Sequence, residues 1–335
     1  WLTSVDGEKY LDALCGVAVT TLGHSHPAIV AAVKAQADKL MHVSNWFEIP
    51  EQAQLAEAIC DISGMESVFF CNSGAEANEA AIKLARLYGS NKGIAKPTIV
   101  VTQDAFHGRT VATISAGGSS RHQAGFGPLL EGFTRVPYDD LEAVRQVAEN
   151  SDNQVVAVLV EPILGESGVI IPSEGYLAGL REICDKNEWL LMLDEIQTGM
   201  GRTGKWFACQ HEGVKPDVLT MAKALGAGVP IGVCAASGRA ANVFQPGTHG
   251  STFGGGPFVS VVGKAVIDTM KAEGAVASAA KIGEKLLVAL RARLGDTELV
   301  DQVRGLGLMI GVALNVEIPN LLQRILDQGL LVNVT

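Results

Sequence analysis

Basic charge is scarce in this 335-residue chain, because 26 lysines and arginines face 36 aspartates and glutamates, for a formal net charge of −10. Nucleic-acid binding needs a basic face, so we expect no nucleic-acid partner. Long apolar runs are also missing. Segments such as "VVAVLV" and "WLLML" end within about six residues, far short of the roughly 20 that a membrane span requires, so we expect no membrane association.

Paired cysteines are absent as well. The six cysteines stand alone, with no C-x-x-C pair, at Cys15, Cys60, Cys71, Cys184, Cys209 and Cys234. This usage is typical of buried thiols in a reducing compartment, and we expect a cytoplasmic protein. The chain starts at Trp1 rather than Met and ends on "LLVNVT", which resembles an interrupted strand. We therefore expect no signal peptide, and we expect both ends to continue in a longer protein.

One segment lacks a single residue of a nucleotide-binding loop. Residues 199–206, "GMGRTGKW", approach the pattern G-x-x-x-x-G-K-[ST]. That pattern needs a Ser or Thr hydroxyl after the lysine to hold magnesium, and Trp206 stands there instead. A P-loop nucleotide-binding protein is thus a remote alternative, which would require magnesium-dependent ATP binding that is lost in Lys205→Ala.

The residues that are present predict a compact α/β protein. Hydrophobic residues make up 47% of the chain, and there are 38 glycines, which is a globular composition. Short apolar runs ("SVFFC", "TIVVT", "VVAVLV", "WLLMLD", "DVLTMA") alternate with helical patterns such as "EGYLAGLREICDKN". Buried strands separated by helices indicate a mainly parallel sheet covered on both faces. A helix is also expected from Ala28 to Leu40, with Pro27 in its first turn.

The length predicts two domains, since one core stops growing at roughly 250 to 300 residues. After "GGGPF", the pattern "KIGEKLLVALRARL" predicts a helix and "VRGLGLMIGVAL" a hydrophobic hairpin, which together indicate a smaller α+β domain. We predict a large domain over residues 28–275. Residues 1–27 would contribute the N-terminal part of the small domain, and residues 276–335 its C-terminal part, which is incomplete.

Ligands of open α/β sheets bind beyond the carboxyl ends of the strands, and four places qualify. Gly74 and Ala75 form a small-residue turn before a helix that we expect to start at Glu76, and free N–H groups there suit an anion. An ordinary capped helix is the alternative. Asp194 ends an apolar strand, where a carboxylate is costly unless it is paired or hydrogen-bonded. A structural salt bridge is the alternative.

The other two places are "DVLTMAKALG" and "DAFHGRTVAT". Lys223 follows an apolar strand, and a desolvated lysine becomes a nucleophilic amine that forms Schiff bases; a surface lysine is the alternative. Phe106, His107 and Arg109 lie in a loop after a strand, where an aromatic plate and an arginine fork suit a flat ring and a carboxylate. Taken together, the four places are the parts needed to hold pyridoxal phosphate (PLP).

Six motifs extend this reading to a family. "NSGAEANEAAIKLAR", "AFHGRT", "VEPILGESG", "LDEIQTGMGRTG", "MAKALGAGVPIG" and "GTHGSTFGG" occur in an order and spacing that resemble the class III (ornithine-type) aminotransferases of PLP fold type I. The resemblance covers essentially the whole chain. It implies that "GMGRTG" only follows the cofactor-binding aspartate, and that the protein is an obligate homodimer with shared active sites.

The resemblance also implies cofactor contacts. Lys223 would bind PLP covalently and move the substrate proton, while Asp194 would pair with the pyridinium nitrogen. Phe106 would stack on the ring, Gln197 would reach its phenolic oxygen, and Thr252 would reach the phosphate from the neighbouring subunit. The whole implied cofactor-binding set is Gly74, Ala75, Phe106, Asp194, Glu195, Ile196, Gln197, Lys223 and Thr252, in which the backbone N–H groups of the first two hold the phosphate.

Substrate contacts are implied in the same way. Arg109 would bind a substrate carboxylate, and Ser251 would be a second contact. Glu166 resembles a gate residue that pairs with an arginine in one half-reaction and releases it to 2-oxoglutarate in the other. That arginine is expected beyond Thr335.

Two histidines raise the question of a metal. His24 and His26 in "GHSHP" stand on alternate residues with no third ligand nearby. Because zinc sites use three or four protein ligands, we predict a structural role for both histidines and no metal site.

The amino donor is suggested by two further segments. "LDALCGVAVTTLGHSHP" and "HVSNWFEIPEQAQLAEAI" are most similar to N-acetylornithine aminotransferases of arginine biosynthesis, and Val17 stands where ornithine δ-aminotransferases share a tyrosine. The resemblance implies that the terminal amino group of N-acetylornithine passes to 2-oxoglutarate, giving N-acetylglutamate semialdehyde and glutamate. Ornithine, 4-aminobutyrate and succinyldiaminopimelate are alternative donors.

Overall fold

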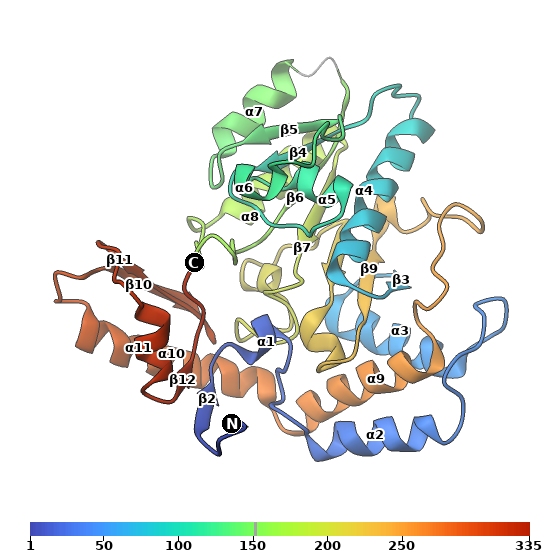
Figure 1. Cartoon of the computed structure of the whole chain (residues 1–335). Coiled ribbons are helices and arrows are strands. Elements are labelled where there is room, and N and C mark those ends of the chain that lie inside the picture. Colours follow the sequence, from blue (N-terminus) through green and yellow to red (C-terminus); the bar gives the residue numbers. More distant parts are fainter. Residues whose placement is uncertain (151–152) are drawn as a thin grey trace.

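A mainly parallel sheet forms the centre of the computed structural model, which describes residues 1–150 and 153–335 (Figure 1). Its strands, in spatial order, are β3 (Ser67–Cys71), β9 (Gly232–Ala236), β8 (Val218–Met221), β7 (Leu190–Asp194), β6 (Val155–Val160), β4 (Thr98–Thr102) and β5 (Phe133–Val136). The pairs from β8 to β5 are parallel, whereas β9 is antiparallel to both β3 and β8. Strand β3 therefore points the same way as β8, and the carboxyl ends of both lie at one edge.

Helices cover both faces of this sheet, as predicted. Along β4, Val100 belongs to one hydrophobic cluster, whereas Ile99 and Val101 belong to another, because alternate side chains of a strand point to opposite faces. The first cluster includes α3 (Pro50–Ser63), α7 (Leu141–Asn150), α8 (Tyr176–Asn187) and α9 (Pro257–Ala272), and the second includes α4 (Gly74–Asn91) and α5 (Val111–Ala116). Within residues 1–150 and 153–335, no helix is both long and apolar enough to cross a bilayer.

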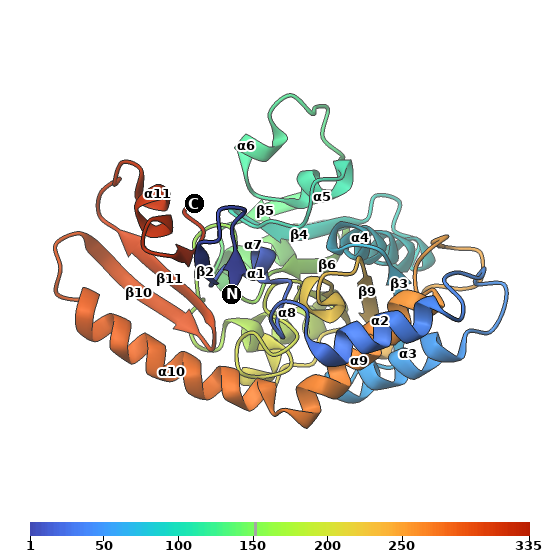
Figure 2. The ribbon, with the colours of Figure 1, turned by 60° about the horizontal axis from the view of Figure 1, so that its bottom comes forward.

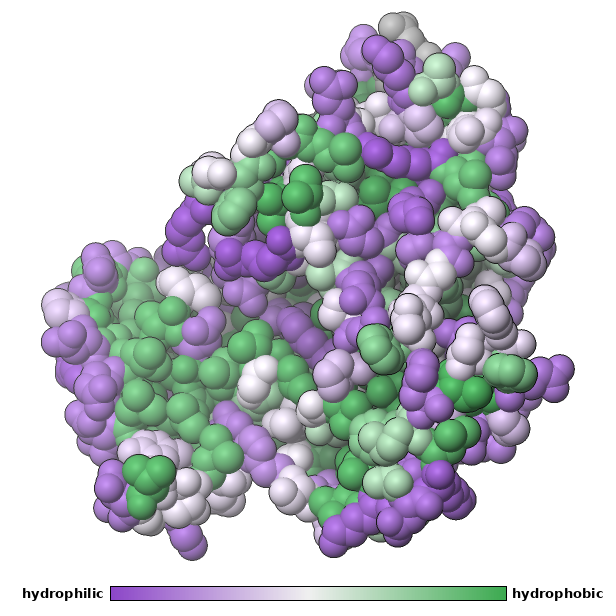
Figure 3. Space-filling view, turned by 45° about the vertical axis from the view of Figure 1, so that its right-hand side comes forward, coloured by the Kyte–Doolittle hydropathy of each residue, from purple (hydrophilic) through white to green (hydrophobic). Residues whose placement is uncertain are grey.

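A smaller lobe combines the two ends of the chain (Figure 2). Strands β1 (Leu2–Thr3), β2 (Lys9–Asp12) and β12 (Leu330–Leu331) form one sheet, and β10 (Val300–Leu306) pairs with β11 (Met309–Leu314) beside α10 (Ala275–Leu294). Apolar side chains gather on this lobe, and the surface is hollowed between it and the main body (Figure 3). The lobe contains both helices and strands from the segments where the smaller α+β domain is predicted. The predicted domain boundaries at residues 27 and 275 stay predictions. Gly274 lies between the end of α9 and the start of α10.

One predicted helix is shorter than expected. Helix α2 spans Pro27–Ala37 instead of reaching Leu40, and Pro27 occupies its first turn as predicted. The Gln36 side chain is buried and donates to the Leu40 carbonyl oxygen at 2.9 Å, which draws the chain out of the helix, and the Leu40 side chain is 47% exposed. The other short elements are α1 (Cys15–Ala18), α6 (Ser120–Gln123), η1 (Ala208–His211), η2 (Lys223–Gly226), η3 (Gly238–Ala240) and α11 (Leu321–Leu326).

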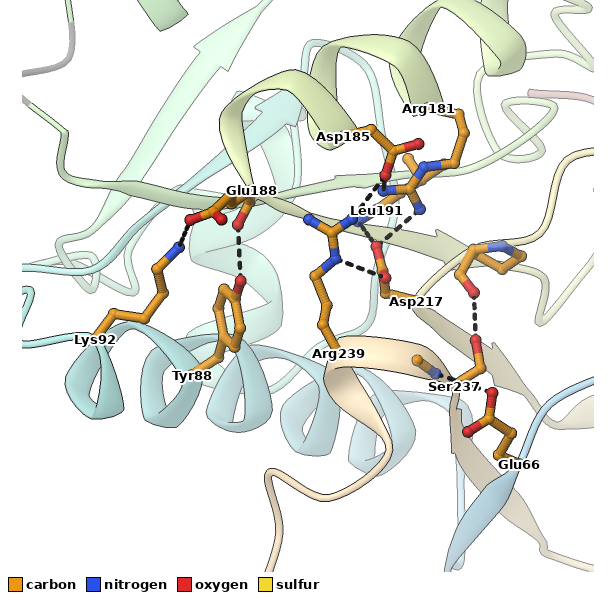
Figure 4. A network of polar contacts seen from close by, with 12 residues as sticks. Glu66, Tyr88, Lys92, Arg181, Asp185, Glu188, Leu191, Asp217, Ser237 and Arg239 are labelled. Atoms are coloured by element: carbon orange, nitrogen blue, oxygen red, sulfur yellow. Dashed lines mark hydrogen bonds and ion pairs between the residues drawn. The ribbon is translucent and has the colours of Figure 1, made fainter.

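A charged network ties the opposite edge of the sheet together (Figure 4). Asp217 precedes β8, and its Oδ2 atom accepts hydrogen bonds of 2.8 Å from Arg181 Nη1 and from the Leu191 N–H. Arg239 lies 3.4 Å from Asp217 and donates to Asp185 at 2.7 Å. Since Asp217 is 7% exposed, its burial is tolerable only because these donors surround it.

We predict that Asp217→Ala lowers the free energy of unfolding by about 3 kcal/mol, because it leaves buried guanidinium and N–H groups unpaired. Asp185→Ala is the matched control, since its side chain is 54% exposed and exposed pairs contribute less than about 1 kcal/mol. Urea denaturation measures both variants. Equal losses would contradict the role assigned to Asp217.

Candidate active site

The predicted site segments meet at the carboxyl edge of the sheet. Phe106 follows β4, Glu166 follows β6, Asp194 ends β7 and Lys223 follows β8. These four strands are adjacent and parallel, so their ends bring the residues to one edge, where open α/β sheets bind ligands. Gly74 follows β3 at the same edge.

Asp194 is the buried centre of this edge, with 4% of its surface exposed. Its Oδ2 atom accepts hydrogen bonds from Asn78 Nδ2 at 2.7 Å and from His107 Nδ1 at 2.8 Å. Its Oδ1 atom accepts a longer bond, 3.1 Å, from the Ile196 N–H. Thr220 Oγ1 donates in turn to Asn78 Oδ1 at 2.8 Å. The Oδ1 atom therefore retains capacity for another donor.

Asn78 was not predicted, and the contact of His107 with Asp194 was not foreseen. The available signal was an asparagine in line with Ile82 and Ala85 on the apolar face of the helical pattern "AEANEAAIKLA", because buried amides occur where they are hydrogen-bonded. Only the fold shows which carboxylate Asn78 serves.

Lys223 is half-buried at the start of η2, with a left-handed φ of +42°. Burial lowers the pKa of its amine, an effect that the carboxylates of Asp194, Glu161 and Glu166 oppose and that Arg202 adds to. The amine is thus neutral at lower pH than an ordinary lysine, as a nucleophile requires. A left-handed backbone is unfavourable for a lysine, and such strain is concentrated at functional sites.

The start of α4 is the place where an anion site is predicted. The helix begins at Gly74 rather than at Glu76, and Ser73 caps it by accepting the Glu76 N–H at 3.2 Å. The helix itself gives the N–H groups of Gly74 and Ala75 no acceptor. A Cβ atom on Gly74 would lie 2.8 Å from Ile196 Cδ1, so a glycine is needed for the 194–197 loop to approach.

Phe106 and Arg109 lie together beyond β4. The Arg109 Cζ atom is 5.7 Å from the centroid of the Phe106 ring, which His122 meets edge-on at 5.5 Å. Arg109 is exposed and Phe106 half-buried, so the guanidinium is accessible to a carboxylate beside the aromatic ring.

Glu161 is a further site residue that the sequence did not single out. Its Oε1 atom accepts the Phe106 N–H at 2.8 Å, and its Oε2 atom accepts the Gly165 N–H at 3.1 Å. Burial and the negative charge of Asp194 raise its pKa to about 7. The position directly after the strand "VVAVLV" was the signal that could have revealed it.

The side chains of Glu195 and Gln197, which follow Asp194, have different surroundings. The Glu195 carboxylate accepts Thr198 Oγ1 at 2.5 Å and the Ala208 N–H at 2.9 Å, so it stabilises the following loop. Gln197 lies against Gly165, where a Cβ atom would overlap its Oε1 atom. Of the two side chains, only that of Gln197 adjoins the Glu166 segment.

Ser251 and Thr252 lie on the connection between β9 and α9. Ser251 Oγ accepts Asn72 Nδ2 at 3.2 Å, which ties this connection to the start of α4, and Asn45 Nδ2 donates to the Ser251 carbonyl at 3.1 Å. Thr252 is exposed and Phe253 is 64% exposed. Ser251 is thus fixed beside the predicted anion site, while the next two side chains point outward.

The "GMGRTGKW" segment does not have the surroundings of a P-loop. It leads into the four-residue η1 rather than a long helix, and a Cβ atom on Gly204 would meet Ala280 at 2.8 Å. Phosphate-binding loops open an α-helix whose N-terminus faces the phosphate. The segment packs against α10 instead, so the nucleotide-binding alternative gains no support.

His24 and His26 contact two different carboxylates. His24 Nε2 bonds Asp12 Oδ2 at 2.7 Å, and His26 Nε2 bonds Glu273 Oε1 at 3.1 Å. Both contacts join the N-terminal segment to its surroundings, which is a structural role.

The raised pKa of Glu161 predicts a pH effect on stability. Folding holds the proton of this carboxyl, so its contribution is fully present below the ordinary pKa of 4.5 and is lost as pH rises towards about 7. We expect unfolding free energies measured by denaturant across this window to fall less steeply with pH in Glu161→Gln than in the wild type. Glu142→Gln, at a side chain 65% exposed, is the control. Identical slopes in all three proteins would contradict the prediction.

The chain is similar over its whole length to proteins named acetylornithine aminotransferase. The acetylornithine aminotransferase of Nitrosomonas europaea is 53% identical over 335 residues, which are 100% of this chain and 85% of that protein. Acetylornithine aminotransferase 1 of Bordetella bronchiseptica is 48% identical over the same shares.

Solved structures of aminotransferases have the same fold as this chain. An ornithine aminotransferase from Toxoplasma gondii superimposes with a TM-score of 0.94 at 33% identity, over 98% of this chain and 80% of that one. An acetylornithine aminotransferase from Elizabethkingia anophelis gives 0.88 at 38% identity, over 98% and 82%. The family model "Aminotransferase class-III" matches residues 1–335, and the chain therefore belongs to the class III aminotransferases.

Proposed function

We propose that this enzyme moves the terminal amino group of N-acetylornithine to 2-oxoglutarate, giving N-acetylglutamate semialdehyde and glutamate, with PLP as its cofactor. The observation that carries the chemistry is the convergence of Lys223 and the buried Asp194 at the ends of two adjacent strands. The names of relatives at 53% and 48% identity support the donor. Ornithine is the second candidate, because the Toxoplasma gondii neighbour is named for it.

The residues at the strand ends fit PLP. The start of α4 offers free N–H groups to a phosphate, and the tight packing of Gly74 on Ile196 leaves no room for a side chain between them. Asp194 Oδ1 can accept a further hydrogen bond, as a pyridinium N–H would supply. Bound PLP provides an electron sink for the electrons left when a proton leaves the substrate carbon.

Lys223 is the group that moves this proton. Its amine, neutral more readily because of burial, would take the proton on Nζ and later give it up again, so that it serves first as a base and then as an acid. Positioned proton transfer of this kind contributes about 10² to 10⁴ in rate. Asp194 balances the ring charge, which at about 4 Å and an effective dielectric of about 20 is worth roughly 4 kcal/mol.

Other residues place the substrate and the cofactor ring. Arg109 would bind a carboxylate beside Phe106, and Ser251 would add a polar contact. Glu166 would act as the gate residue, pairing with an arginine when the amine is bound and withdrawing for 2-oxoglutarate. Gln197 would reach the phenolic oxygen, and residues 195 and 196 would complete the loop.

A homodimer with shared sites is part of the proposal. Trp46 and Phe47 are 93% and 65% exposed, and a cavity of about 570 Å³ lined by Phe47 and Phe70 lies beside them. The α2–α3 and β9–α9 connections project on the same side of the molecule (Figure 1), where Asn45 bonds the Ser251 carbonyl. A second copy on this side would cover the apolar groups and receive Thr252. A cytoplasmic location is supported by the six unpaired thiols.

The visible absorption of the purified enzyme tests the reaction. We expect a band from bound PLP that disappears when N-acetylornithine is added and returns with 2-oxoglutarate. Lys223→Ala should lose at least about 10²-fold in turnover, because its proton transfer is removed. Bleaching by ornithine or 4-aminobutyrate alone would move the assignment to that donor, and a protein that cannot be loaded with PLP would contradict the proposal.

Mixed dimers test the shared site. Thr252→Ala should weaken PLP binding about tenfold through loss of a hydrogen bond to a charged group. A dimer of Thr252→Ala and Lys223→Ala subunits contains one site with both native residues, so mixing should restore activity at limiting PLP. Lys223→Ala mixed with Arg109→Ala is the control, since both residues would act in one subunit. Failure of the first mixture to recover would contradict the sharing.

A further inference from the structure

The segment that carries Glu166 is a tight loop under backbone strain. Leu164 and Ile170 close it by exchanging backbone hydrogen bonds of 3.1 and 3.0 Å. Inside the loop, Gly168 and Val169 both have left-handed φ angles, +98° and +58°. That conformation is unfavourable for a β-branched valine, so contacts from outside have to hold the loop in this form.

The main outside contact comes from the small lobe. Arg304 on β10 donates to the Gly168 carbonyl oxygen from both Nε, at 3.1 Å, and Nη2, at 2.8 Å. Its Nη1 atom donates to Gln302 Oε1 at 3.1 Å, which orients the guanidinium. A second contact joins the loop to the Phe106 segment, since Ser167 Oγ donates to the Asp104 carbonyl at 2.5 Å. Hydrogen bonds from a guanidinium are stronger than neutral ones, so Arg304 is the principal outside support.

The β10–β11 hairpin is itself fixed to the main body. The Leu308 N–H at its turn donates to the Arg202 carbonyl at 2.9 Å, within the "GMGRTGKW" segment. A Cβ atom on Gly311 would lie 2.9 Å from the Gly168 carbonyl oxygen, so the two backbones are in close contact. The hairpin thus contacts the loops that follow both β6 and β7.

The Glu166 carboxylate makes no hydrogen bond or ion pair with residues 1–150 or 153–335, while its charge acts on Lys223 and His122. Arg304 therefore fixes the backbone of the loop that carries Glu166, while the Glu166 carboxylate itself is available to pair with another cation. We propose that Arg304 is a positioning residue that holds the Glu166 loop in place from the small lobe. This inference rests on the proposed function and adds a residue to the gate.

Hydrogen–deuterium exchange tests the contact without using activity. Arg304→Gln should accelerate exchange of the amides of residues 164–170 about tenfold, because it removes a charge-assisted support of the loop. Arg291→Gln is the matched control, as its Nε atom bonds the Val303 carbonyl of the same strand at 3.1 Å and it should leave this segment unchanged. If Arg304→Gln does not fold, Gln302→Ala removes only the orienting bond and should give a smaller effect of the same sign. Unchanged exchange in a folded variant would overturn the proposal.

Kinetics with PLP-loaded enzyme test whether Arg304 acts through Glu166. Arg304→Gln should raise the KM for 2-oxoglutarate about tenfold while the PLP spectrum and affinity stay those of the wild type. In a Glu166→Gln background the same substitution should add no further change. A full effect in that background would overturn the proposal. Wild-type enzyme that is inactive with N-acetylornithine would contradict the proposed donor instead, and the exchange comparison would still decide the role of Arg304.

Discussion

A carboxylate at the buried end of a strand needs donors around it, and Asp194 imposes this need on the whole edge of the sheet. Asn78 from α4 and His107 from the segment after β4 both donate to it. Neither could reach Asp194 unless β4, β7 and the start of α4 met at one edge. The parallel order of the strands thus allows a charged Asp194 to be buried, because it brings these donors to the carboxylate. Its Oδ1 atom can still accept a hydrogen bond from a cation.

The same edge concentrates negative charge around one lysine. Burial lowers the pKa of Lys223, and the carboxylates of Asp194, Glu161 and Glu166 oppose this shift without cancelling it. The pKa of Glu161 is raised because the carboxyl is buried and because the negative charge of Asp194 lies near it. In the proposed function, a cationic ring would find the Asp194 carboxylate already placed, and a phosphate would find the N–H donors at the start of α4.

Some predictions from the sequence agree with the structure, and others do not or stay predictions. Apolar runs such as "TIVVT" and "VVAVLV" form strands at the expected positions, and the structure places Asp194 at the end of a strand and Lys223 and Phe106 after strand ends. The predicted end of α2 was wrong because the apolar pattern continues to Leu40, whereas the Gln36 side chain bonds the Leu40 carbonyl outside the helix. The predicted roles of the site residues stay predictions, although the fold brings the strand-end residues to one edge.

The sequence by itself determined five strands of the main sheet, several of the helices and the chemical groups at the strand ends, because hydrophobic periodicity and the choice of residue after a strand are local properties. Only the tertiary structure decided which groups meet. Asn78 and Asp194 are 116 residues apart, and Arg304 and Gly168 are 136 apart. Contacts at such separations depend on strand order and on how the small lobe packs, and no local pattern encodes either.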